Sequence, residues 1–147
     1  MPPDFTPLPK PSAAGGSYLP VVIHQGLAFV SGQLPRLDGV VQYCGKVGHS
    51  VSLEQAQKAA RLCASQCLAA LDQELGGLSR VIRILRVTGY VASAPGFDQQ
   101  PAVMDAASEY FCEVLGSRGQ HARSAIGVAE LPRGACVEVE ITVAVKD

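Results

Sequence analysis

The C-terminal part of the chain contains the side chains whose types and spacing could do chemistry. Residues 121–145 read HARSAIGVAELPRGACVEVEITVAV and form two β-type runs around a Leu-Pro-Arg-Gly turn at residues 131–134. In the second run, apolar residues alternate with polar or small ones, which is the pattern of a strand buried on one face. Glu138 and Glu140 therefore share the other face. We interpret the two runs as a β-hairpin that carries the active site.

Arg123 lies in the first run and is the cation that completes this group. Ser124, Ile126 and Val128 are the more apolar set of that run. We expect them to face the core, which turns Arg123 to the face that holds the two glutamates. A guanidinium beside carboxylates, among Ala and Gly, indicates a small cavity that binds an anion next to an acid/base group. The alternative is an exposed salt bridge, which contributes little to stability.

Length and composition describe one small domain, residues 1–147, with a Pro-rich extended arm at residues 1–14. Hydrophobic residues make up 48% but aromatic residues only 5%, so we expect a core of Val, Leu, Ala and Ile. The formal net charge is -1 and Lys and Arg do not cluster, which argues against nucleic acid or a membrane as partner. No apolar run approaches the ~20 residues of a membrane span, and no signal-peptide pattern is present. We expect a cytoplasmic protein.

The cysteines do not have the spacing of a disulfide framework. They number five, at positions 44, 63, 67, 112 and 136, so we expect reduced thiols. Cys63 and Cys67 are one helical turn apart, but no second pair completes a metal site. We interpret them as small core residues and predict no metal.

The remaining patterns predict an α+β fold in the order β-β-(β)-α-β-α-β-β, with both helices on one face of a sheet. In order, they predict a hairpin over residues 19–31, a short strand over 40–43, and a helix from a Ser52/Gln55 capping box to Gly76. A strand over 80–92 follows, in which Gly89 marks either a bulge or a close contact, and then a helix from Pro101 to Gly116 and the two final runs.

Several motifs together resemble those of the Rid family, the reactive intermediate deaminases, also called YjgF-like proteins. At the C-terminal end these are Arg123-Ser124, Val128-Ala129, Leu131-Pro132 and Val137-Glu138-Val139, and upstream they are Gly16-x-Tyr18 and FVSGQLP at residues 29–35. The resemblance covers nearly the whole chain. It implies a chorismate-mutase-like fold and a homotrimer, with sheets around a central barrel and ligand clefts between neighbouring subunits.

The same resemblance implies a function. Family members hydrolyse reactive enamines and imines to 2-keto acids and ammonia, without a metal or organic cofactor. By this resemblance Arg123 binds the carboxylate of a small imino or keto acid, and Glu138 positions a water and transfers a proton. Glu140 is the reserve candidate for that acid/base role, or else it pairs with an arginine at a subunit contact.

The resemblance also assigns residues of the N-terminal part to substrate binding. Tyr18 closes the cleft, and the backbone around Ser31, Gly32 and Gln33 binds a polar end of the ligand. The alternative for this segment is an ordinary turn at the end of a strand.

Two positions depart from the pattern of the family. Ala125 stands where many members have a pocket cysteine, which indicates a longer branch whose substrate differs in size or type. His121 stands where a small residue is usual, so it either adds a titrating group beside the site or is simply solvated.

Two other functions compete with imine hydrolysis. A trimer with the same clefts could bind a small carboxylate or keto acid without turning it over. Some relatives carry an endoribonuclease or translation-inhibitor description, but this sequence lacks a basic groove, interleaved aromatic residues and a pair of histidines. We therefore expect the endoribonuclease function least.

Overall fold

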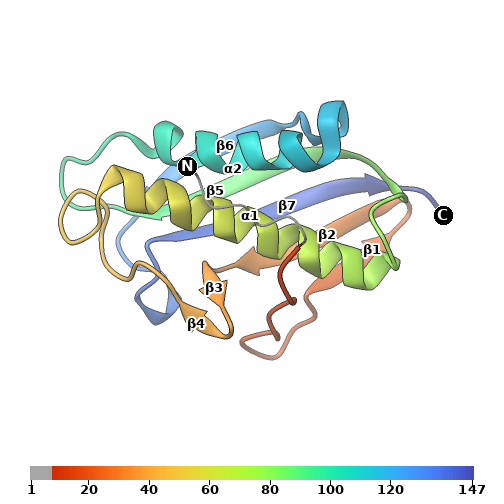
Figure 1. Cartoon of the computed structure of the whole chain (residues 1–147), viewed down its shortest axis with the longest axis horizontal. Helices are drawn as coiled ribbons and strands as arrows, with labels where there is room; N and C mark the ends of the chain where they lie inside the picture. Colours follow the sequence, from red (N-terminus) through yellow and green to blue (C-terminus); the bar gives the residue numbers. More distant parts are fainter. Residues whose placement is uncertain (1–7) are drawn as a thin grey trace.

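A five-stranded sheet with two helices on one face is the framework of the protein, so the predicted α+β class and element order are confirmed (Figure 1). The computed structural model describes residues 8–147; the first seven residues of the predicted arm lie outside the described part. The elements are β1 (Val21–His24), β2 (Leu27–Gln33), β3 (Arg36–Leu37), β4 (Val40–Val41), α1 (Leu53–Leu75), β5 (Val81–Ala92), α2 (Gln100–Leu115), the 3-10 turn η1 (Gly116–Gly119), β6 (Ala122–Val128), the 3-10 turn η2 (Pro132–Gly134) and β7 (Val137–Val145).

The order of strands in the sheet is β1-β2-β7-β5-β6, so the predicted hairpin of the last two runs is wrong. β5 lies between them, pairing parallel with β6 and antiparallel with β7. Parallel neighbours need a long crossover, and α2 supplies it between β5 and β6. The connection from β6 to β7 passes over the end of β5, where Ser93 N donates to Val128 O and Ala92 N donates to Cys136 O.

This strand order also places Arg123 on the face opposite Glu138 and Glu140, against our expectation. Arg123 is the register partner of buried Val87, whereas Glu138 is the partner of Tyr90 on the open face. Directly paired residues point to the same side of a sheet. Ile126, which we expected in the core, lies on the open face and is 45% exposed. β6 is an edge strand, so its helix-covered side lies next to the polar side of α2. There the Arg123 guanidinium forms hydrogen bonds with Asp105 and Ser108.

The predicted ends of the helices and the first turn are confirmed. The β1–β2 turn has positive φ at Gln25 and Gly26, as a two-residue hairpin requires. Ser52 and Gln55 form the capping box of α1, which ends at Gly76 with φ 69°. Pro101 lies in the first turn of α2. Across residues 8–147, no helix combines the length and the apolar character needed to cross a membrane.

Small residues lie where α1 and α2 pack on the sheet. Cys63 and Cys67 are fully buried in the core, where burial raises the pKa of both thiols. Gly89 of β5 is packed so tightly against Met104 of α2 that a Cβ atom there would overlap the Met104 side chain. The role predicted for both cysteines and for the glycine is thereby confirmed.

The short β3–β4 ribbon and the N-terminal segment are tied to α1 through one buried amide. The predicted short strand of this region is the two-residue β4, and it pairs with β3 outside the main sheet. Gln66, 2% exposed, donates from Nε2 to Arg36 O (2.9 Å) and accepts at Oε1 from Ser12 N and Oγ (both 3.2 Å). Residues 8–14 form neither helix nor strand. This amide fixes the segment beside the start of β3.

Replacement of Ser52 by alanine should lower the free energy of unfolding by about 1 kcal/mol, because the hydroxyl no longer accepts from Gln55 N. Denaturant unfolding measures the change. Ser79→Ala is the control, since Ser79 is exposed and precedes β5. Equal stability of Ser52→Ala and Ser79→Ala would contradict a stabilising role of the cap.

Candidate active site

A cleft of about 500 Å³ opens between the N-terminal segment, the end of β2, the start of β7 and the η2 turn. Six of the nine residues predicted for the site line it, namely Tyr18, Ser31, Gly32, Gln33, Glu138 and Glu140. Arg123, Ala125 and His121 are not among its lining residues. The sequence patterns therefore identified one wall of the cleft and, separately, a group on the far side of the sheet.

Glu138 is a half-buried carboxylate in the wall of the cleft. It lies directly on Gly32, where a Cβ atom would overlap its carboxylate. Within residues 8–147 no group donates a hydrogen bond to it. Burial and, next, repulsion from Glu140 raise the pKa of Glu138 above its ordinary value of 4.5. A carboxyl group with a raised pKa and a free face has the properties of a general acid/base.

Glu140 is bound by a residue that the sequence patterns did not identify. The Tyr90 hydroxyl donates to Glu140 Oε1 from the neighbouring strand β5. This hydrogen bond, followed by burial, raises the pKa of Tyr90 to about 12, so the phenol remains a donor. Tyr90 lies on the open face of β5, and the register of β5 with β7 brings it to Glu140. The two glutamates thus differ: one is held by a neighbour and the other is available.

The N-terminal wall is built from backbone and hydroxyl groups. Ser31 Oγ donates to Leu19 O (2.7 Å), and Ser31 N donates to Pro20 O (2.9 Å). Tyr18 is 52% exposed and accepts from Gly15 N (3.1 Å). Gln33 is almost buried, and its amide donates to Ser31 O (3.2 Å). These contacts hold the end of β2 while Tyr18 remains at the mouth of the cleft.

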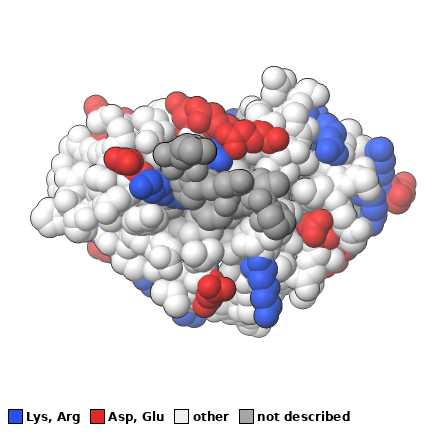
Figure 2. All heavy atoms as spheres, in the orientation of Figure 1, with Lys and Arg blue, Asp and Glu red and all other residues white. Residues whose placement is uncertain are grey.

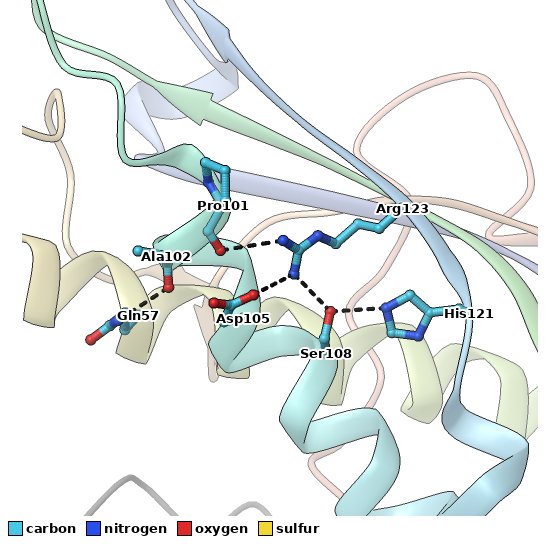
Figure 3. A network of polar contacts seen from close by, with 7 residues as sticks. All are labelled: Gln57, Pro101, Ala102, Asp105, Ser108, His121 and Arg123. Carbon is cyan, nitrogen blue, oxygen red and sulfur yellow. Dashed lines mark hydrogen bonds and ion pairs between the residues drawn. The ribbon is translucent and has the colours of Figure 1, made fainter.

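Arg123 belongs to a separate polar network between β6 and α2 (Figure 3). Its Nη1 donates to Asp105 Oδ1 (2.9 Å) and to Ser108 Oγ (3.1 Å), and its Nη2 donates to Pro101 O (3.4 Å). The Arg123 side chain is 22% exposed and Asp105 is 62% exposed. The guanidinium is therefore held at the edge of the sheet, at the surface, by partners from one helix.

His121 is part of this network and is not simply solvated. Its Nδ1 lies 2.6 Å from Gly119 O and its Nε2 lies 2.9 Å from Ser108 Oγ. Because a carbonyl only accepts, Nδ1 carries the proton and Nε2 accepts from the Ser108 hydroxyl. Burial, and also the charge of Arg123, lowers the pKa of His121, which favours this neutral form. Ala125 lies on the same side of β6 and packs against the core.

Two arginines in the cleft were missed by the sequence reasoning. Arg36 follows directly after the FVSGQLP motif, and Arg133 lies in the turn between the two final runs. The sequence offered one indication of Arg36 as a site residue, namely its position directly after this motif. Arg133 has φ 58°, so the turn holds its backbone in the left-handed region. Across residues 8–147, no group of three or more His, Cys, Asp or Glu is arranged to hold a metal ion.

Replacement of Glu138 by glutamine should raise the melting temperature at neutral pH. A raised pKa means that the folded state binds the proton of Glu138 more tightly than the unfolded state does, so its ionisation destabilises the fold. This destabilisation is fully present above the folded-state pKa and disappears as pH falls below the ordinary value of 4.5. The gain should vanish over the same range in thermal unfolding from about pH 8 to about pH 3.5. Glu74→Gln, at an exposed carboxylate, is the control; a gain independent of pH would contradict the assignment.

Comparison with known proteins confirms the resemblance to YjgF-like proteins. A family model described as "YjgF/chorismate_mutase-like, putative endoribonuclease" matches residues 5–141. Protein TCP17 of Trypanosoma cruzi is 39% identical over 137 residues, which are 92% of this chain and 86% of that protein. The crystal structure of Atu1372 from Agrobacterium tumefaciens is 42% identical with a TM-score of 0.86, covering 88% of this chain and 84% of that one. A Shewanella oneidensis structure with the same endoribonuclease description is 30% identical with a TM-score of 0.91, covering 94% and 91%. A match over nearly the whole chain, in sequence and in fold, means that this protein belongs to the YjgF/chorismate-mutase-like family.

Proposed function

We propose that this protein hydrolyses reactive imines and enamines of amino acids to 2-keto acids and ammonia. The observation that carries the proposal is Glu138, a carboxylate with a raised pKa that faces a cleft and has no hydrogen-bond partner within residues 8–147. A free acid/base group in a small cleft suits a reaction that needs one water and two proton transfers. The resemblance of the site motifs to those of the Rid family supports the same reaction.

Glu138 serves both proton transfers in this scheme. Its carboxylate accepts a proton from water as the water oxygen bonds to the carbon of the protonated imine, which gives a neutral carbinolamine. The carboxyl group then returns this proton to the nitrogen, the C–N bond breaks, and the hydroxyl proton passes to the departing ammonia, so that a keto acid and ammonium leave. One water is consumed and no electrons are transferred. A raised pKa brings the group closer to neutral pH, where it exchanges protons more readily in both directions.

Arg123 binds the substrate carboxylate in this proposal, and it acts in the cleft of a neighbouring copy. In a single chain the guanidinium and Glu138 lie on opposite faces of the sheet, so one ligand cannot contact both. β6 is an edge strand, and Arg123 is at the surface of that edge. In a trimer with clefts between subunits, this edge approaches the open face of the next copy. The carboxylate would compete with Asp105 for Nη1.

The open face of the sheet supports an assembly of this kind. Val22 and Phe29 form a cross-strand pair that is 49% and 48% exposed, and Ile126 on β6 is 45% exposed. Both helices lie on the other face, so they do not cover these side chains (Figure 1). Exposed apolar side chains on a sheet face are typical of a surface that meets another chain. We propose that these side chains are buried in the trimer.

The first test measures imine hydrolysis by the wild type and by Arg123→Ala and Glu138→Gln. An amino-acid oxidase generates the imine, and ammonia release is followed. Loss of the acid/base group should reduce kcat about 10²- to 10⁴-fold. Loss of Arg123 should reduce kcat/KM at least tenfold, since a charge-assisted pair is worth about 1.5–3 kcal/mol. Full activity of either variant would remove its residue from the proposed site.

Mixing Arg123→Ala with Glu138→Gln, the two impaired variants, tests directly whether neighbouring copies share the site. After joint unfolding and refolding, mixed trimers contain clefts with Arg123 from one copy and Glu138 from the next. About a quarter of the sites in an equal mixture should regain both residues. The control is a mixture of Glu138→Gln with itself, refolded in the same way. No gain of activity in the mixed variants, with trimers present by light scattering, would overturn the site shared between neighbouring copies.

Replacement of Gly32 by alanine tests the position of the Glu138 carboxylate. The added Cβ atom would overlap that carboxylate, so the Glu138 side chain must turn away from its position against β2. We expect kcat to fall about tenfold or more, because a displaced acid/base group loses much of its ~10²-fold or larger contribution. Steady-state kinetics measure the change, and Gly32→Ala combined with Glu138→Gln is the control. A further large loss of kcat in the double variant would show that the two changes act independently.

The alternative functions make different predictions in the same assays. Saturable binding of 2-keto acids without faster ammonia release would favour a binding protein. An endoribonuclease needs a cationic surface for RNA, whose binding is sensitive to salt. On the face shown in Figure 2, coloured side chains of both signs are interspersed, without a continuous basic stripe. No histidine is among the lining residues of the described cleft.

A further inference from the structure

Arg36 is a cation inside the cleft that neither the proposed reaction nor the network of Arg123 uses. It is half-buried at the start of β3 and lines both the cleft and the adjoining hollow under residues 9–13. Arg36 N donates to Leu34 O (2.8 Å), and the buried Gln66 amide donates to Arg36 O (2.9 Å). The backbone from which the side chain extends is therefore fixed from both sides.

One edge of the Arg36 guanidinium has no partner within residues 8–147. Nη1 donates to Ala13 O at a long 3.3 Å, whereas Nε is buried and unpaired. Nη2 also makes no hydrogen bond there, and no carboxylate forms an ion pair with the side chain. Nε and Nη2 form the edge of a guanidinium that binds a carboxylate through two parallel hydrogen bonds. A buried donor without a partner is unfavourable unless a ligand satisfies it.

The stretch that covers this edge contains two consecutive glycines, Gly15 and Gly16. A Cβ atom at Gly15 would lie 3.3 Å from Arg36 Nη2 and 3.7 Å from the Tyr18 hydroxyl, so the chain passes directly over both groups. The next residue is also a glycine, and two glycines in a row leave the backbone free to change conformation. An anion that reaches Arg36 from the cleft would displace this stretch and take its place beside Tyr18.

Two arginines and two glutamates line the same cleft without forming ion pairs with one another in the described part of the chain. Burial and, next, repulsion from Glu140 raise the pKa of Glu138. Arg36 and Arg133 form no ion pair within residues 8–147, yet both line the same cleft as the glutamates. A ligand whose reactive carbon is at Glu138 would extend its far end toward the arginines.

We propose that Arg36 binds a second acidic group of the substrate, so that the cleft prefers imines whose side chain carries a carboxylate. This inference rests on the proposed function for the reaction, but not for the binding of the acid itself. Arg123 of a neighbouring copy holds the carboxylate next to the imine carbon, and Arg36 holds the one on the side chain. A guanidinium binds this group in two parallel hydrogen bonds, which an ammonium does not reproduce.

The experiment compares two imines of equal chain length, generated by amino-acid oxidases from glutamate and from norvaline. The wild type should have the higher kcat/KM for the glutamate imine. In Arg36→Leu the ratio of the two kcat/KM values should fall about ten- to hundredfold, and Arg36→Lys should retain part of it. Arg80→Leu is the matched control, because Arg80 is outside the cleft and, within residues 8–147, its side chain donates only to Lys146 O. It should leave the ratio unchanged.

Binding measurements separate failure of this inference from failure of the proposed reaction. Calorimetry compares 2-oxoglutarate with 2-oxopentanoate on the wild type and on Arg36→Leu. Tighter binding of the diacid, lost in Arg36→Leu, supports the second acidic subsite even where neither imine is hydrolysed. Equal affinity for the two acids, an equal loss for both in Arg36→Leu, or binding of neither acid would overturn it. Thermal unfolding of Arg36→Leu should show unchanged or raised stability, because an unpaired buried donor is removed. A large drop would instead assign Arg36 a structural role.

Discussion

The position of β5 between β6 and β7 determines where the charged groups of the candidate site lie. Because α2 joins β5 to β6, the two strands are parallel, and their register places Arg123 beside Val87 on the helix-covered face. The antiparallel register of β7 places Glu138 beside Tyr90 on the open face. The thickness of one sheet separates guanidinium from carboxylate in a single chain. A ligand that uses both groups can do so only where the edge of one copy meets the open face of another.

The difference between the two glutamates follows from their neighbours in the sheet. A buried carboxylate is costly unless hydrogen bonds satisfy it, and Glu140 receives one from Tyr90. Glu138 receives none within residues 8–147 and lies against Gly32, which has no side chain to fill the space above it. The absence of a Cβ atom thus leaves room both for the carboxylate and for a ligand. Glu138 therefore keeps a raised pKa and a free face, which suit proton transfer better than the pairing of Glu140 does.

Short sequence patterns correctly predicted the features that depend on neighbouring residues alone. The capping box at Ser52, the turn at Gly26 and the buried Cys63 and Cys67 each follow from a few neighbouring residues, and the structure confirms them. Pairing between distant strands does not follow in this way. The alternation in β6 is equally compatible with a hairpin and with a parallel edge strand, and the wrong choice turned Arg123 to the wrong face. Motif matching found five lining residues of the cleft, and the alternation of the last strand added Glu140. Arg36 joins them only in the folded chain, where β3 lies beside the N-terminal segment.

The unpaired edge of Arg36 is a cost that folding alone does not explain. An apolar side chain at this position would avoid a buried donor without a partner, and Gln66 would still bind the backbone carbonyl. A guanidinium is therefore better explained by what binds to it than by what it contributes to stability. Glu138 and Glu140 line the same cleft but form no ion pair with Arg36 within residues 8–147, so the guanidinium is available to an anionic group of a ligand.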